Sequence, residues 1–185
     1  AVAGPDAGRF LDGATGVDCS SLGSYESAPA RLSDVDTLIV RTDFLRLPSY
    51  DLIVPSHSGD QVRAGLLDAG QSAHLTPVDA EAAESVRVEQ GVPGFGKELT
   101  EEFNPLEAGL LGLISFTKGC YVGQEVVTRL NTYKKVQKRL MSLRWEGEAD
   151  PDTGGKLLLD GKQVGVVTSI ARSPSSQRGV GLGYV

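Results

Sequence analysis

The chain has 185 residues, of which 40% are hydrophobic and 23% are charged, and its formal net charge is −6 at pH 7. This composition is typical of a globular protein, and the length allows one large domain or two small ones. The acidic balance argues against wholesale binding to nucleic acid or to an anionic membrane, although a local basic patch is compatible with it. Two widely separated cysteines make no disulfide framework, and no signal peptide or membrane-spanning segment is recognisable. We therefore predict a reducing location, the cytoplasm or a mitochondrial matrix.

The first ninety residues have the pattern of an α+β layer. A short apolar run opens the chain and predicts the end of a strand, and a helix follows with Pro5 in its first turn. Apolar runs on either side of Pro48-Ser49 predict a hairpin. Two more helices are expected, one closed by Gly70 and the other by Gly91. The predicted bounds are 36–43 and 50–54 for the strands of the hairpin, and 58–69 and 79–90 for these two helices.

The pattern changes to β after about residue 136. Apolar side chains alternate with polar or small ones in 141–145 and in 180–184, which predicts strands with one buried face. Asp160-Gly161 separates two further apolar runs and is a strong signal for a two-residue hairpin turn. We divide the chain into an α+β region, residues 1–135, and a β domain, residues 136–185. Both ends fall inside predicted strands, so we expect a segment of a longer protein, incomplete at both termini.

The stretch K-G-C-Y-V-G-Q-E, residues 118–125, is the most informative of the chain. Two glycines bracket Cys120, and the residues that follow have the pattern of a helix. A thiol beside Lys118 and close to a helix start lies near partial positive charge, which favours the thiolate over the thiol. We predict that Cys120 is a functional thiol held at the surface, the alternative being a small residue packed in a glycine-rich turn.

The same octapeptide resembles the signature of the YgfZ family, folate-binding proteins related to the glycine-cleavage aminomethyltransferases (the T-protein, or GcvT-like, family). Three other segments agree with this resemblance in order: 86–91, Glu98-Leu99 and 104–110. The resemblance implies a ferredoxin-like α/β unit followed by a small C-terminal β-barrel, both within a longer protein. It also implies a binding site for tetrahydrofolate.

The folate-binding residues that the resemblance implies are Arg87, Glu89, Glu107, Lys118 and Tyr121. A guanidinium group suits the glutamate tail of folate, and a carboxylate suits the edge of its pterin. Two residues apart on a helix, Arg87 and Glu89 point about 200° away from each other. At most one of them is therefore expected to contact the ligand, and Arg87 is favoured. A surface ion pair is the alternative for this pair, and an anchor that accepts backbone amides is the alternative for Glu107.

The run Tyr133–Arg139 is strongly basic. It could attract polyglutamylated folate or an RNA backbone, and the alternative is a solvated strand edge. His57 and His74 are the only histidines and belong to no Cys/His cluster, so no metal site is predicted.

Three functions follow from these observations. The first is a tetrahydrofolate-binding, YgfZ-like protein, which the resemblance links to the maintenance or assembly of iron–sulphur enzymes and to tRNA modification, with Cys120 as its thiol. The second is an aminomethyltransferase of the T-protein type, although residues 44–49 lack the Gly-Glu pair of that family. The third is a non-catalytic interaction module. The predicted partners are folate, iron–sulphur client proteins and weakly bound RNA, with no membrane.

Overall fold

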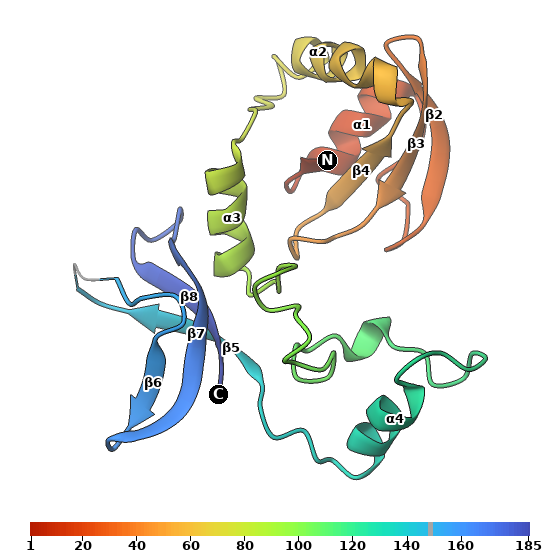
Figure 1. Ribbon diagram of the computed structural model, residues 1–185. Coiled ribbons are helices and arrows are strands. Elements are labelled where there is room, and N and C mark those ends of the chain that lie inside the picture. The colour runs from red at the N-terminus through yellow and green to blue at the C-terminus, as the bar shows by residue number, and fades with distance from the viewer. Residues whose placement is uncertain (148–149) are drawn as a thin grey trace. The chain divides into compact units, whose positions relative to one another are not determined.

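The computed structural model describes residues 1–147 and 150–185, which divide into two compact units, Ala1–Asp79 and Ala80–Val185 (Figure 1). Each unit combines helices with a four-stranded antiparallel sheet. The predicted mixed α+β class is therefore confirmed. The predicted domain boundary after residue 135 stays a prediction.

The sheet of the first unit has the strand order β1-β4-β3-β2. Its strands are β1 (Val2–Ala3), β2 (Ser27–Leu32), β3 (Val35–Arg41) and β4 (Ser49–Ile53), and its helices are α1 (Ala7–Thr15) and α2 (Gly59–Ala69), the latter preceded by a 3₁₀ turn, Ser56–Ser58. The predicted opening strand, the hairpin and both helices are confirmed. β2 is an additional strand that the sequence analysis did not predict, and it contains Pro29. Proline is tolerated there since β2 is an edge strand.

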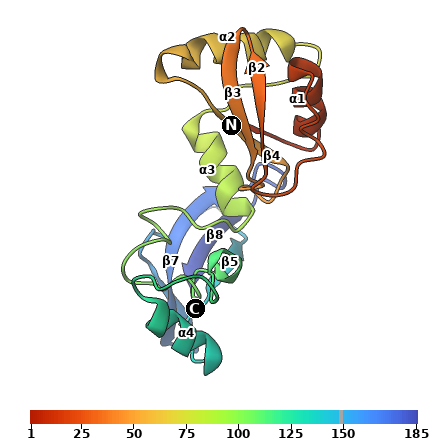
Figure 2. The same cartoon turned by 90° about the vertical axis from the view of Figure 1, so that its right-hand side faces the viewer.

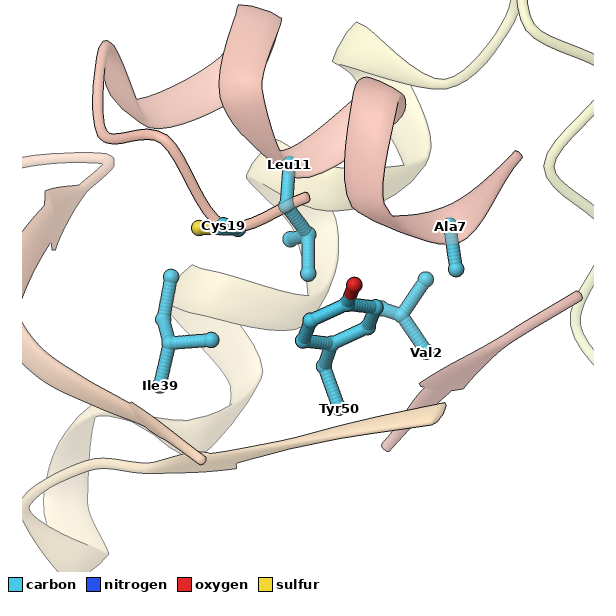
Figure 3. Packing of buried hydrophobic residues seen from close by; sticks show 6 residues of the cluster. All are labelled: Val2, Ala7, Leu11, Cys19, Ile39 and Tyr50. Atoms are coloured by element: carbon cyan, nitrogen blue, oxygen red, sulfur yellow. The ribbon is translucent and has the colours of Figure 1, made fainter. Parts of the chain in front are cut away.

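The core of this unit lies between the sheet and its helices. Figure 3 shows Leu11 of α1 above Ile39 and Tyr50 of the sheet, all of them buried. A Cβ atom at Gly8 would lie 2.7 Å from the Tyr50 hydroxyl oxygen, so glycine lets the helix approach the ring. Cys19 is buried in the same core, and burial raises the pKa of its thiol.

The second unit contains α3 (Ala80–Glu89), a 3₁₀ turn (Leu111–Leu113), α4 (Gln124–Thr132), β5 (Leu140–Trp145), β6 (Lys156–Leu159), β7 (Lys162–Arg172) and β8 (Gly179–Tyr184). Its strand order is β5-β8-β7-β6. Asp160 and Gly161, with φ of 50° and 76°, form the predicted tight turn between β6 and β7. The helix after the K-G-C-Y-V-G-Q-E stretch is also confirmed, as α4.

Helix α3 packs against β7 and β8 (Figure 2). Val88 of α3 forms a buried cluster with Val180 and Leu182 of β8. The opposite face of β8 carries only glycines, and a Cβ atom at Gly179 would lie 2.1 Å from the indole ring of Trp145. The side chain of a β5 residue thus occupies the space that a side chain on β8 would need.

Candidate functional site

Arg87 lies at the centre of a buried polar cluster, which we call the Arg87–Glu98 network. Its guanidinium group donates to both carboxylate oxygens of Glu84, at 2.6 and 2.7 Å, to Glu98 Oε2 at 2.9 Å, to Ser169 Oγ at 2.9 Å and to the carbonyl oxygen of Val92. A guanidinium group has five N–H donors, so all of them are used within the unit. The predicted folate contact of Arg87 stays a prediction, and it would require the exchange of one of these bonds.

Glu98 is the buried partner of Arg87, with a fully inaccessible side chain. One carboxylate oxygen accepts hydrogen bonds from the hydroxyl groups of Thr168 and Ser169, both at 2.6 Å, and the other accepts from Arg87 and from the backbone N–H of Gly94 at 2.8 Å. Burial is the largest single influence on Glu98 and raises its pKa. The hydrogen bonds from Ser169, Thr168 and the Gly94 N–H, together with the charge of Arg87, outweigh burial, so the pKa of Glu98 lies below its ordinary value. The carboxylate is therefore held in its charged form.

Glu89 lies two residues beyond Arg87, at the end of α3. Its carboxylate accepts hydrogen bonds from the hydroxyl of Ser173, at 2.6 Å, and from that of Ser175. The bond from Ser173, followed by that from Ser175, lowers the pKa of Glu89. Both Arg87 and Glu89 thus bond to β7 or to the turn that follows it. Helical spacing predicts that the side chains of Arg87 and Glu89 point in opposite directions. Both nevertheless reach this part of the sheet, because α3 lies against it and ends at Glu89.

Glu107 anchors its own loop. Its carboxylate accepts the backbone N–H of Asn104 at 3.0 Å, while Asn104 Oδ1 accepts the N–H groups of Leu106 and Glu107 at 3.0 and 3.1 Å. This reciprocal arrangement resembles a capping box. The geometry matches the anchoring alternative, and a folate contact of Glu107 stays a prediction.

Tyr184 of β8 contacts the Arg87–Glu98 network and also borders a surface hollow. Its hydroxyl donates to the backbone oxygen of Glu98 at 2.9 Å, and its ring stacks on Phe103 with 3.5 Å between the ring centroids. Burial, reinforced by the charge of Glu98, raises the pKa of Tyr184 to about 12. One side of Tyr184 borders a hollow of about 330 Å³, which is lined by Lys138, Gln163, Val164, Gly165, Val166 and Tyr184.

The signature loop, residues 118–123, lies outside the network. Cys120 is exposed on this loop, as predicted for a thiol held at the surface. Gly123, with a φ of 86°, ends the loop and precedes the first residue of α4. The reactivity of Cys120 and its contact with a ligand stay predictions.

Lys118 and Tyr121 flank Cys120. The Lys118 ammonium group lies 4.9 Å from the centroid of the Tyr121 ring, which is a cation–π contact. The Tyr121 hydroxyl oxygen is shielded from solvent and forms no hydrogen bond with any described residue. A buried hydroxyl without a partner costs free energy, so it is a polar group that a ligand could satisfy. These three residues are neighbours, whereas Arg87, Glu89 and Glu107 are each bonded within their own surroundings.

Residues 1–147 and 150–185 include no cluster of three or more His, Cys, Asp or Glu side chains arranged to hold a metal ion. Across the same residues, no helix has the length and apolar character needed to cross a membrane.

Sequence reasoning missed the partners of Arg87. Only Glu84 carries a local signal, the i, i+3 spacing on one helix face. Glu98 and Ser169 lie 11 and 82 residues from Arg87, and no spacing rule connects them to it.

The two sheets and their helices define an α+β protein whose second sheet belongs to a barrel-type domain. Sequence models of two families match the chain: the GCVT N-terminal domain at residues 1–118 and the glycine cleavage T-protein C-terminal barrel domain at residues 138–185. The chain therefore belongs to the GcvT-like family of the glycine cleavage T-protein. The predicted succession of an α+β region and a barrel domain is confirmed. The narrower assignment to the YgfZ branch is a proposal, taken up below.

Aminomethyltransferases are among the relatives of this chain. Those of Halothermothrix orenii and Thermus thermophilus are 30% and 32% identical over 100% of this chain, which covers 52% and 50% of their own length. A chloroplastic protein of Arabidopsis thaliana, named as a transferase, is 42% identical over 59% of this chain and 25% of its own. The aminomethyltransferase T of Bartonella henselae has a similar fold, with a TM-score of 0.50 and 17% identity over 99% of this chain and 74% of that one. The chain thus spans about half the length of the curated aminomethyltransferases that it matches.

Proposed function

We propose that the protein binds tetrahydrofolate and acts as a folate-dependent aminomethyltransferase of the T-protein type. The observation that carries this proposal is the match to aminomethyltransferases over the whole chain, at 30% and 32% identity. Tetrahydrofolate is then the substrate that accepts the one-carbon unit. Since the chain covers about half of those relatives, the proposal concerns the complete protein.

The signature loop offers groups that suit folate. Lys118 supplies an exposed cation for a carboxylate, and the unpaired Tyr121 hydroxyl supplies a hydrogen-bond donor or acceptor for a polar ring edge. The Arg87–Glu98 network acts by position: it fixes α3 and the 92–99 loop against β7, which keeps the surrounding scaffold rigid. In this proposal Lys118 and Tyr121 bind and orient the substrate, while Arg87, Glu89 and Glu107 maintain the shape of the region.

Release of ammonia tests this function. The complete protein is mixed with an aminomethyl-loaded lipoyl carrier, and ammonia is measured with and without tetrahydrofolate. We expect release that depends on tetrahydrofolate. Ammonia release that is unchanged by tetrahydrofolate, or absent with it, would contradict the proposal.

A second candidate is the YgfZ-like accessory function, in which the protein supports iron–sulphur enzymes and tRNA modification in the cytoplasm or a mitochondrial matrix. It is favoured by one observation, the exposure of Cys120 at the centre of K-G-C-Y-V-G-Q-E. Iron–sulphur client proteins and a weak RNA contact belong to this candidate. Here Cys120 is the functional thiol, and the altered hairpin at 44–49 counts against aminomethyl transfer.

Complementation separates the two candidates. In a null strain, the complete Cys120→Ala protein is compared with Val122→Ala, a variant of a fully exposed neighbour on the same loop. We expect Val122→Ala to restore the iron–sulphur phenotype and Cys120→Ala to fail. If Cys120→Ala restores it equally well, the thiol-dependent function is excluded.

A further inference from the structure

We infer that the segment 129–139, here called the basic segment, binds the poly-γ-glutamyl tail of folate. This inference deepens the proposed function and rests on it, because it names the polyglutamylated form of tetrahydrofolate as the preferred substrate. The segment comprises the end of α4 and the connection to β5.

The density of positive charge distinguishes this segment from the rest of the chain. It contains five cations and no acidic residue in a protein of net charge −6: Arg129, Lys134, Lys135, Lys138 and Arg139. None of the five forms an ion pair with a carboxylate of the described residues, whereas arginines such as Arg41, Arg87 and Arg178 do. One or two cations near the end of α4 would be accounted for by the helix dipole, but five exceed that need.

Part of the basic segment lines a hollow in the surface. Arg129, Leu130, Tyr133 and Lys135 line a depression of about 270 Å³ at the end of α4. Lys135 lies 5.9 Å from the centroid of the Tyr133 ring, which places an ammonium group and a phenol side by side. The wall thus combines a guanidinium group, an ammonium group and a hydroxyl with one apolar side chain.

A carboxylate tail is favoured over nucleic acid because the segment offers few aromatic rings on which bases could stack. The volume of the hollow accommodates one or two small anionic groups, and a guanidinium group pairs with a carboxylate through two parallel hydrogen bonds. Lys134, Lys138 and Arg139 continue the positive charge along the chain, as a tail with one carboxylate for each glutamyl unit requires. Nucleic acid without sequence preference is usually bound with several stacking aromatic rings, and this segment offers only Tyr133.

Calorimetry on the complete protein tests the inference with three ligands: tetrahydrofolate monoglutamate, tetrahydrofolate pentaglutamate and free penta-γ-glutamate. We expect wild type to bind the pentaglutamate about tenfold more tightly than the monoglutamate, because several charge-assisted contacts are added. The double variant R129Q/K135Q should reduce this ratio to about twofold or less and leave monoglutamate affinity unchanged. The matched control K156Q/K162Q, which removes two exposed cations from β6 and β7, should preserve the ratio.

The outcomes distinguish a failure of the tail site from a failure of the proposed folate-dependent function. Equal affinity of wild type for the mono- and pentaglutamate would overturn the inference and leave folate binding intact. Binding of free penta-γ-glutamate that is lost in R129Q/K135Q would support the tail site even if neither folate bound, and that result would count against the proposed function alone. Tighter binding of a single-stranded RNA decamer than of penta-γ-glutamate, lost in the same double variant, would assign the segment to nucleic acid and overturn the inference.

Discussion

The Arg87–Glu98 network and the basic segment belong to the same compact unit and use charged residues in opposite ways. In the network every guanidinium donor and both carboxylate oxygens of Glu98 are bonded, and the side chains of Arg87 and Glu98 are buried. In the basic segment five cations remain exposed without a carboxylate partner among the described residues. A buried charge needs a partner within the protein, whereas an exposed one is stabilised by water and stays available to a ligand. We therefore expect the network to contribute to stability, whereas the exposed segment and the signature loop are the recognition elements of the two proposals above.

Among the variants that test this comparison, removal of the Glu98 carboxylate should cause the largest loss in the free energy of unfolding. Glu98→Ala leaves the buried Arg87 charge without its partner, so we expect the free energy of unfolding to fall by about 3–5 kcal/mol. Urea unfolding followed by the fluorescence of Trp145, the only tryptophan and a residue of the same unit, measures the loss. The control Glu101→Ala, at an exposed position nearby, should change stability by less than about 0.5 kcal/mol. Equal losses in the two variants would show that the network does not stabilise the unit.

The Tyr184 hydroxyl bond should matter less. Tyr184→Phe keeps the ring that stacks on Phe103 but leaves the backbone oxygen of Glu98 without its donor, which should cost about 1–2 kcal/mol. Tyr133→Phe removes a hydroxyl from an exposed side chain and should cost nothing measurable in the same urea assay. A loss at Tyr133 that matches the loss at Tyr184 would argue against a structural role for the buried bond.

Acid should weaken the network through Glu84. The hydrogen bond from Arg87, assisted by Lys97, lowers the pKa of Glu84 from 4.5 to about 2. Because the pKa is lower in the folded protein, the ionised Glu84 stabilises the fold at pH values above its ordinary pKa. This stability is lost as the pH falls from 4.5 through about 2. Because Glu84 is partly exposed and screened by solvent, we expect about 1 kcal/mol. Unfolding measured across this pH range should show a shallower pH dependence in Glu84→Gln, and Glu81→Gln on the same helix serves as the control.

Substitution of Cys120 should give the smallest change in stability. The two cysteines should differ clearly in their accessibility to a thiol reagent. In the native protein an aromatic disulfide reagent should modify Cys120 and leave the buried Cys19 intact until the chain is unfolded. Cys120→Ala should abolish the native reaction and change the free energy of unfolding by less than about 0.5 kcal/mol. Two thiols reacting at the same rate in the native protein would contradict this placement.

Local patterns predicted most of the fold. The end of the helix of residues 80–89 at the left-handed Gly91 and the Asp160-Gly161 turn follow from local chemistry that acts over a few residues. The same holds for the loop anchored by Glu107, whose partner Asn104 lies three residues away. The strand containing Pro29 was not predicted, and its place at the sheet edge makes proline acceptable there.

The candidate site was predictable only in part. Exposure of Cys120 follows from its flanking glycines, and the basic segment is visible in the sequence. The role of Arg87 was not, because its partners Glu98 and Ser169 reach it only through tertiary packing of α3 on β7. The same residue type in the same helix would have been exposed had that packing been absent.

The glycine face of β8 has a consequence for how this family member can change over time. A Cβ atom would collide with the indole of Trp145 at Gly179, with the carbonyl oxygen of Ser169 at Gly181, 2.7 Å away, and with that of Val166 at Gly183, 2.6 Å away. A side chain at any of these three positions would force the neighbouring atoms to move, so we expect substitutions to be tolerated better at the positions between them. Saturation mutagenesis should show a tolerance to substitution that alternates along β8 with a period of two residues, the same period as the pleat of the strand.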